Sequence, residues 1–230
     1  MIKAIIFDLD DTLYNEREFV FGAFKEVSDY LADKYKLNET IVYEDIIQIF
    51  NEYGRGKIFD KICEKYSIDE NISELVNVYR GSKPLLNLYK DAEEILLWLK
   101  ANNYKIGLIT DGMSMVQWNK IDVLRLKSRV NSIVVSDDLG KDYWKPHEKP
   151  YRECIKALDI REDECMYVGD NPNKDFIGAR KLNIGTIRII REAGDHMKIS
   201  LEEAYEADYK INSLKDIIKI IDIVNKREVR

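Results

Sequence analysis

Short apolar runs of strand length recur along the chain, and segments with helical spacing of apolar residues lie between them. The runs that predict strands are residues 4–7, 106–110, 132–136, 166–169 and 186–190, with a shorter one at 209–212. Helical spacing predicts helices over residues 92–102, 115–124, 149–158, 176–182 and 214–224. Strands that alternate with helices are typical of a parallel sheet covered by helices on both faces. We therefore predict an α/β fold.

The stretch between the first strand and residue 92 breaks this alternation. It contains no convincing strand pattern, and its apolar residues have helical spacing over residues 21–35, 42–53, 58–66 and 73–79. Because a parallel sheet does not require such an excursion, we predict an inserted α-helical cap domain over residues 15–89. The core would then consist of residues 1–14 and 90–230, and both linkers would act as hinges.

Composition and charge argue against several classes of protein. The 230 residues include 36 Lys and Arg against 42 Asp and Glu, a net charge of −6. The chain therefore lacks the excess of positive charge that is typical of proteins that bind a nucleic acid polymer. No apolar run approaches the length of a membrane span, and the chain enters a strand without a signal peptide. The cysteines, Cys63, Cys154 and Cys165, lack metal-ligand spacing. We expect a cytoplasmic protein with reduced cysteines and no membrane partner, and the sequence indicates no oligomeric state.

Two carboxylates, Asp8 and Asp10, directly follow the first apolar run. Where a buried strand ends and the chain turns, both can face the crevice in which open α/β sheets bind ligands. One carboxylate can attack a phosphate while the other handles the proton of the leaving group, with Mg²⁺ between them. The alternative is an acidic turn that only caps a helix or closes a loop.

Thr110, Asp111 and Gly112 stand at the end of the second predicted strand. The Thr110 hydroxyl and the backbone N–H groups of Asp111 and Gly112 can point at phosphate oxygens. The same three residues would also make a good turn and helix cap.

Lys145 precedes Pro146, which restricts its backbone to an extended form. An ammonium presented in this way near several carboxylates would stabilise a nucleophile and offset phosphate charge. The alternative is a solvated loop lysine.

Asp170 ends another predicted strand, and Asp175 follows one short loop later. Two oxygen donors in this arrangement suit a hard cation. Asp175 could instead serve only as a charge at the start of a helix.

Taken in order, these motifs resemble those of the haloacid dehalogenase superfamily: Asp-x-Asp-x-Thr, then Thr, then Lys, then Gly-Asp-x-x-x-x-Asp. The pattern extends from Asp8 to Asp175. The resemblance implies a Rossmann-like core with a small helical cap of the C1 type that closes over the site. One departure is the stretch 140–144 before Lys145, which is longer than in many members.

The resemblance also implies a role for each matching residue. Asp8 would be the nucleophile that becomes an aspartyl phosphate, and Asp10 the general acid and base. Thr110 and Lys145 would bind the phosphate and neutralise its charge, and Asp111 and Gly112 would contribute to the phosphate cradle.

A Mg²⁺ site is implied as well. The carboxylates of Asp8 and Asp170 and the backbone carbonyl of Asp10 would bind the ion, supported by Asp175. A dehalogenase of this superfamily would lack the acid Asp10 and much of this metal site. We therefore predict a Mg²⁺-dependent phosphatase that acts on a small phosphorylated metabolite, such as a sugar phosphate or a nucleotide.

Two other functions stay open. A phosphomutase of the β-phosphoglucomutase type uses the same residues and returns the phosphoryl group to a bound sugar. A binding module without turnover would be expected to have lost Asp8, Asp10 or Lys145. Within phosphatases, Thr110, followed by Gln117 and Lys120, is similar to nucleotidases and acylneuraminate-9-phosphatases with the same cap type.

Arg55 and Lys57 alternate with glycines between two helices of the predicted cap. Their long cationic side chains could reach the non-reacting end of an anionic substrate. A flexible solvated turn is the alternative, which we slightly prefer.

Overall fold

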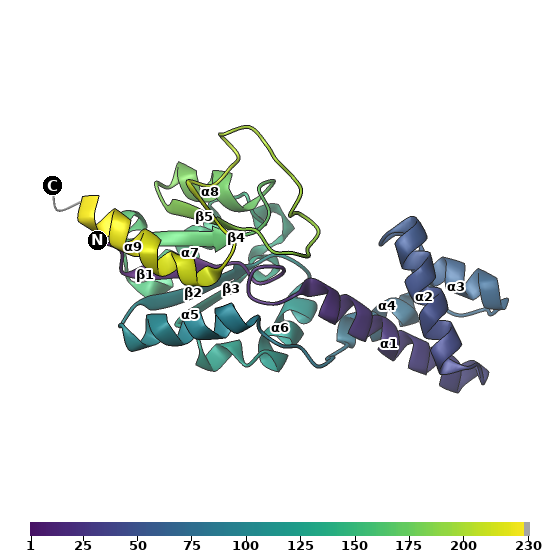
Figure 1. The fold of residues 1–230 in the computed structure, drawn as a ribbon. Helices are drawn as coiled ribbons and strands as arrows, with labels where there is room; N and C mark the ends of the chain where they lie inside the picture. Colours follow the sequence, from purple (N-terminus) through teal and green to yellow (C-terminus); the bar gives the residue numbers. More distant parts are fainter. Residues whose placement is uncertain (228–230) are drawn as a thin grey trace. The chain divides into compact units, whose positions relative to one another are not determined.

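The computed structural model describes residues 1–227, and the chain divides into two compact units (Figure 1). The core unit contains Met1–Glu16 and the chain from Asn87 onward. The helical unit is Arg17–Leu86. None of the described helices is long and apolar enough to cross a membrane.

A six-stranded sheet forms the centre of the core unit, and every strand pair in it is parallel. The strands are β1 Ala4–Phe7, β2 Lys105–Thr110, β3 Ser132–Val135, β4 Cys165–Gly169, β5 Gly185–Ile189 and β6 Tyr209–Ile211. They lie in the order β3-β2-β1-β4-β5-β6. The four residues of β1 are all buried, as expected for a central strand that is covered on both faces.

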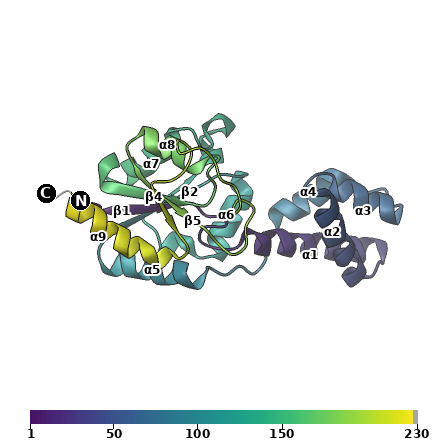
Figure 2. The same ribbon diagram turned by 45° about the horizontal axis from the view of Figure 1, so that its top comes forward.

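Helices cover both faces of this sheet. The helices of the core unit are α5 Lys90–Ala101, α6 Ser114–Val123, α7 Lys149–Leu158, α8 Asp175–Lys181 and α9 Ile217–Arg227. Figure 2 shows α7 and α8 on one side of the sheet, and α5 and α9 on the other. On the α7 side, Ile6 and Ile109 pack in one apolar cluster with Tyr151, Ile155 and Phe176. The predicted α/β fold is confirmed.

Short 3₁₀ helices shape several connections: η1 Leu126–Ser128, η2 Ser136–Leu139, η3 Lys141–Tyr143, η4 Glu162–Glu164 and η5 Leu214–Asp216. Two of them change predicted boundaries. The strand predicted over residues 132–136 ends at Val135, where η2 begins. The helix predicted over residues 214–224 begins as η5, whose first turn the Ser213 hydroxyl caps by accepting a hydrogen bond from Lys215 N (3.3 Å), and continues as α9.

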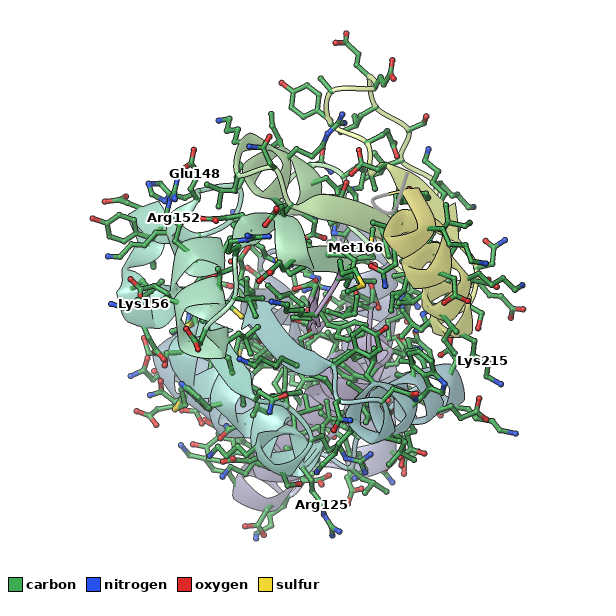
Figure 3. All side chains as sticks on the ribbon, turned by 90° about the vertical axis from the view of Figure 1, so that its left-hand side faces the viewer. Arg125, Glu148, Arg152, Lys156, Met166 and Lys215 are labelled. Atoms are coloured by element: carbon green, nitrogen blue, oxygen red, sulfur yellow. The ribbon has the colours of Figure 1, made fainter. Side chains whose placement is uncertain are left out.

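The solvent-facing side of α7 carries charged residues four positions apart. Figure 3 labels Arg152 and Lys156 on it and Glu148 directly before its first residue, and Arg152 Nη2 lies 2.9 Å from Glu148 Oε2. Tyr151 and Ile155, on the opposite face, are buried against the sheet. This division into a polar and an apolar face is what orients the helix.

The helical unit contains four helices among its described residues: α1 Glu16–Tyr35, α2 Glu39–Tyr53, α3 Ile58–Tyr66 and α4 Ile72–Gly81. Asparagine side chains cap two of them. Asn38 accepts a hydrogen bond from Ile41 N (3.1 Å) and Asn71 one from Ser73 N (2.9 Å).

An aromatic cluster supplies this unit with a core of its own. The Phe24 ring lies 5.5 Å from Phe50, 6.5 Å from Phe59 and 5.5 Å from Tyr79, measured between ring centroids. Pairs at these distances stabilise a core beyond the burial of their apolar surface.

Gly22→Ala is expected to destabilise the helical unit. A Cβ atom at Gly22 would lie 2.2 Å from Pro84 Cβ, so the overpacking should cost about 1–3 kcal/mol and outweigh the better helix propensity of alanine. Gly81→Ala is the matched control, because no atom lies within 4 Å of its added Cβ. Urea unfolding of both variants checks this, and equal stability of the two would contradict the close contact.

Candidate active site

Three neighbouring strands of the core unit end at the same edge of the sheet. Asp8 follows β1, Thr110 ends β2, and Asp170 follows β4. The register pairs Phe7 with both Leu108 and Val168, so Asp8, Thr110 and Asp170 lie within one residue of the same level along the sheet. The sheet alone therefore brings together polar residues that are far apart in the sequence.

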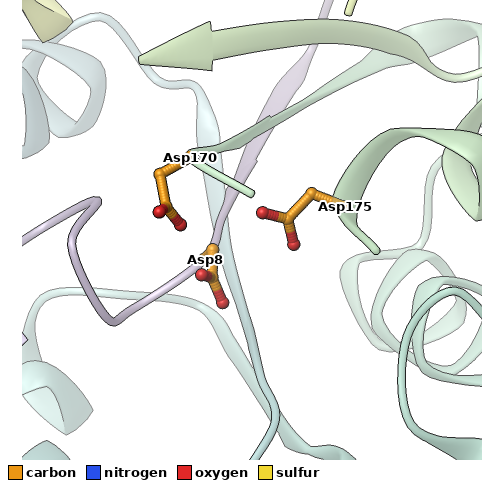
Figure 4. Close-up of side chains that lie close together, drawn as sticks. All are labelled: Asp8, Asp170 and Asp175. Atoms are coloured by element: carbon orange, nitrogen blue, oxygen red, sulfur yellow. The ribbon is translucent and has the colours of Figure 1, made fainter. Parts of the chain in front are cut away.

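A buried acidic cluster lies at this edge. Asp8, Asp170 and Asp175 each place a carboxylate oxygen within 4.8 Å of the others (Figure 4). Asp175 is the first residue of α8, and its carboxylate lies against Gly169. A Cβ atom at Gly169 would come within 2.5 Å of Asp175 Oδ2, so only glycine leaves room for the cluster.

The Lys145 ammonium stabilises this cluster. It donates to Asp8 Oδ1 (2.6 Å), Asp175 Oδ1 (2.8 Å) and the Tyr167 hydroxyl (2.8 Å). The side chain is 0% exposed, which excludes a solvated loop lysine. The segment before it folds into η3, and Trp144 Nε1 donates to Asp137 Oδ1 (3.2 Å), so its extra length does not keep Lys145 from the cluster.

Two of the three carboxylates in the acidic cluster resist ionisation. Burial raises the pKa of Asp8 to about 7, although Lys145 opposes the shift. Burial, reinforced by Asp175 and Asp8, raises the pKa of Asp170 well above its usual value. Asp170 Oδ2 is buried and has no hydrogen-bond partner among the described residues. An all-oxygen donor set with an unsatisfied carboxylate is what a hard cation such as Mg²⁺ requires, so the residues fit that ion.

The carboxylate of Asp10 is separate from the acidic cluster. Its Oδ1 accepts hydrogen bonds from Lys120 Nζ (2.7 Å) and the Tyr14 hydroxyl (2.6 Å), and its Oδ2 accepts one from Gln117 Nε2 (3.0 Å). Burial would raise the pKa of Asp10, but the positive charge of Lys120 and these hydrogen bonds outweigh burial and lower it.

Thr110 is fully buried beside Asp10, and its hydroxyl accepts a hydrogen bond from Gln117 Nε2. Asp111 Oδ1 accepts the backbone N–H of Lys145 (3.2 Å), which links the turn after β2 to the lysine segment. Gly112 has φ +135°, a conformation that glycine adopts readily, and the Gln117 side chain fills the space where a Cβ would lie.

The model of the haloacid dehalogenase-like hydrolase family matches residues 5–189. The chain belongs to this family. It is 32% identical to the glyceraldehyde 3-phosphate phosphatase of Methanocaldococcus jannaschii, over 98% of this chain and 100% of that protein. It is 25% identical to the pyrophosphatase PpaX of Bacillus mycoides, over 97% and 99% of the two chains.

Solved structures show the same fold. A phosphatase of the family from Thermococcus onnurineus is 24% identical, with a TM-score of 0.61 over 96% of this chain and 98% of the other. A 2-haloacid dehalogenase from Pseudomonas syringae is 20% identical, with a TM-score of 0.67 over 97% and 99%. Together with the named relatives, the family makes this protein a hydrolase that acts on phosphate esters.

Several residues of the hydrolase site were given no role by sequence reasoning. Gln117 and Lys120 contact Asp10, Tyr14 donates to it, and Tyr167 donates to Asp175 Oδ1 (3.2 Å). The sequence contains a signal for two of these residues. Gln117 and Lys120 are three residues apart in the helix after Thr110, and this spacing places both on one face.

The predicted cap residues Arg55 and Lys57 lie in the helical unit of the hydrolase. Both are exposed, and both line a pocket of about 340 Å³ together with Phe24, Phe59 and Arg80. Both residues lie in the exposed turn between α2 and α3, and the pocket that they line combines aromatic side chains with cations.

Lys145→Met is expected to abolish activity and to destabilise the core unit. The substitution leaves Asp8 and Asp175 buried without their cation, which should cost roughly 3–5 kcal/mol of the free energy of unfolding. Lys141→Met, at an exposed position nearby, is the control and should leave both properties unchanged. Chemical unfolding and phosphate release measure the two effects. Wild-type stability of Lys145→Met would contradict the ionised buried cluster.

Proposed function

We propose that the hydrolase is a Mg²⁺-dependent phosphatase that releases phosphate from a small phosphorylated metabolite through an aspartyl phosphate on Asp8. The observation that carries the proposal is the position of Asp8, buried at the end of the central strand and 2.6 Å from the Lys145 ammonium. The lysine contact fixes the orientation of the Asp8 carboxylate and favours its ionised, nucleophilic form against the burial that raises its pKa.

In the first half of the reaction, a carboxylate oxygen of Asp8 attacks phosphorus and the ester oxygen leaves. Asp10 gives that oxygen a proton, so an alcohol departs rather than an alkoxide. The negative charge of a bound phosphate opposes the ionisation of Asp10, so substrate binding itself favours the protonated acid. In the second half, Asp10 takes a proton from water, which attacks the aspartyl phosphate and restores Asp8.

The remaining residues of the site bind the phosphate. The Thr110 hydroxyl and the backbone N–H groups of Asp111 and Gly112 would donate to its oxygens. Lys145 would offset charge that develops on the phosphoryl group.

Asp8, Asp170 and Asp175 would hold the Mg²⁺ ion, with the backbone carbonyl of Asp10. When bound there, the ion neutralises phosphate charge and orients the substrate. The unsatisfied oxygen of Asp170 and the proximity of the three carboxylates support this assignment.

For the substrate, the named relatives suggest where to begin. Glyceraldehyde 3-phosphate is the first compound to assay, because the chain matches phosphatases of that name over nearly its whole length.

We assign the helical unit as the cap domain, and Arg55 and Lys57 as candidates for contact with the non-reacting end of the substrate. Three buried free cysteines are compatible with a cytoplasmic location.

Asp8→Asn is expected to lower phosphate release by at least about 10³-fold, because the carboxamide keeps the shape of the side chain without its nucleophilic charge. Asp142→Asn, at an exposed position, is the control and should retain wild-type turnover. Assays count free phosphate from glyceraldehyde 3-phosphate and from 4-nitrophenyl phosphate. Turnover of Asp8→Asn near the wild-type rate would refute the nucleophile, and isomerisation of a sugar phosphate without free phosphate would indicate a mutase.

Mg²⁺ is expected to stabilise the protein as well as activate it. An ion that binds only the folded state at about 100 times its Kd adds roughly 2.7 kcal/mol, seen as a higher Tm. Chelator should abolish both effects, and Asp170→Asn should weaken both, because it removes one anionic ligand from the cluster. Full activity in excess chelator, with no shift in Tm on adding Mg²⁺, would overturn the metal assignment.

A further inference from the structure

Three side-chain donors hold the partly exposed carboxylate of Asp10. Its side chain is 21% exposed, yet both of its oxygens are engaged. Two of the three donors, Gln117 and Lys120, come from α6, and each is almost completely buried. We infer that Gln117 and Lys120 are positioning residues that fix the Asp10 carboxylate for proton transfer to the leaving group.

Burial of the Lys120 ammonium is the first argument. A buried ammonium is costly unless it is paired, and the nearest carboxylate to Lys120 is that of Asp10, at 2.7 Å. Glu16 Oε1 is more distant, at 3.8 Å. The buried Lys120 side chain therefore makes its shortest ionic contact with Asp10, the proposed acid and base.

Gln117 supplies the second argument, because its amide links two parts of the site. Nε2 donates both to Asp10 Oδ2 (3.0 Å) and to the Thr110 hydroxyl. Close packing against Gly112 limits the freedom of the glutamine. The position of Asp10 is therefore tied to the hydroxyl that would bind the phosphate, as transfer to an oxygen of that phosphate requires.

The third argument is the torsional freedom of aspartate. A general acid must lie within hydrogen-bond reach of the oxygen that it protonates. Without Lys120 and Gln117, only the Tyr14 hydroxyl would hold Asp10 among the described contacts, and it contacts Oδ1 alone. The carboxylate could then turn away from the leaving group.

The inference rests on the proposed function. Assays with two kinds of leaving group distinguish a failure of the inference from a failure of the proposed function. An alkyl ester needs a proton from Asp10, whereas 4-nitrophenolate leaves without one. The parameter kcat/KM reports the steps up to departure of the leaving group, and it is free of the later hydrolysis of the aspartyl phosphate. A residue that only supports the fold would lower kcat/KM for both kinds of substrate.

The experiment measures kcat/KM of Lys120→Met and Gln117→Leu for 4-nitrophenyl phosphate and for an alkyl phosphate that the wild type hydrolyses, glyceraldehyde 3-phosphate being tried first. For Lys120→Met we expect a loss of at least about 10-fold on the alkyl phosphate and a change below about threefold on the aryl phosphate. Gln117→Leu also removes a hydrogen bond to the Thr110 hydroxyl, so for it we expect the loss on the alkyl phosphate to exceed the loss on the aryl phosphate by about 10-fold. Lys127→Met is the matched control, because that lysine also pairs with an aspartate (Asp122, 2.6 Å) but is 58% exposed.

Equal losses on both substrates, or none on either, would overturn the inference. If Lys120→Met does not fold, Gln117→Leu, which removes no charge, decides the question alone. Asp10→Asn tests the proposed function separately. If Asp10→Asn shows no selective loss on the alkyl phosphate, the acid assignment fails, whereas a selective loss in Asp10→Asn without one in Lys120→Met or Gln117→Leu refutes only the positioning role.

Discussion

The buried ammonium of Lys145 balances carboxylates that would otherwise repel one another. Its 2.6 Å and 2.8 Å contacts join Asp8, from the central strand, to Asp175, at the start of α8. Breaking such a pair in the interior leaves an uncompensated charge, so each partner depends on the other. Asp170 remains the unsatisfied member of the acidic cluster, and its carboxylate oxygen without a donor makes the site suited to a cation.

The parallel sheet delivers the charged groups to one place. Since β1 lies between β2 and β4, the residues that follow these strands meet at one edge. The buried guanidinium of Arg188 also contacts this edge of the sheet. Arg188 in β5 donates to the backbone carbonyl of Asp170 (3.2 Å) and to both oxygens of Glu206 (2.8 and 3.0 Å), and thereby links the long segment after β5 to the acidic cluster.

Asp8 and Asp10 are two residues apart and lie in opposite electrostatic environments. Burial raises the pKa of Asp8 to about 7 in spite of Lys145, whereas Lys120 and neighbouring hydrogen bonds lower the pKa of Asp10 in spite of burial. These shifts run against the proposed tasks of the two residues, and bound ligands would reverse them: a cation at the acidic cluster would lower the pKa of Asp8, and a phosphate would raise that of Asp10. Each has its own lysine, so the proposed nucleophile and the proposed acid are served by separate cations.

The sequence determined the α/β class and the family, because strand-length apolar runs and the spacing of Asp8, Asp10 and the later motifs are local properties of the chain. It also placed Asp8 and Asp170 after buried strands, where parallel strand ends must meet. Only the tertiary structure decided that Lys145 is enclosed rather than solvated, and that Lys120 reaches Asp10. Those contacts join residues more than a hundred positions apart, and no local pattern specifies which lysine of a charged chain will be buried.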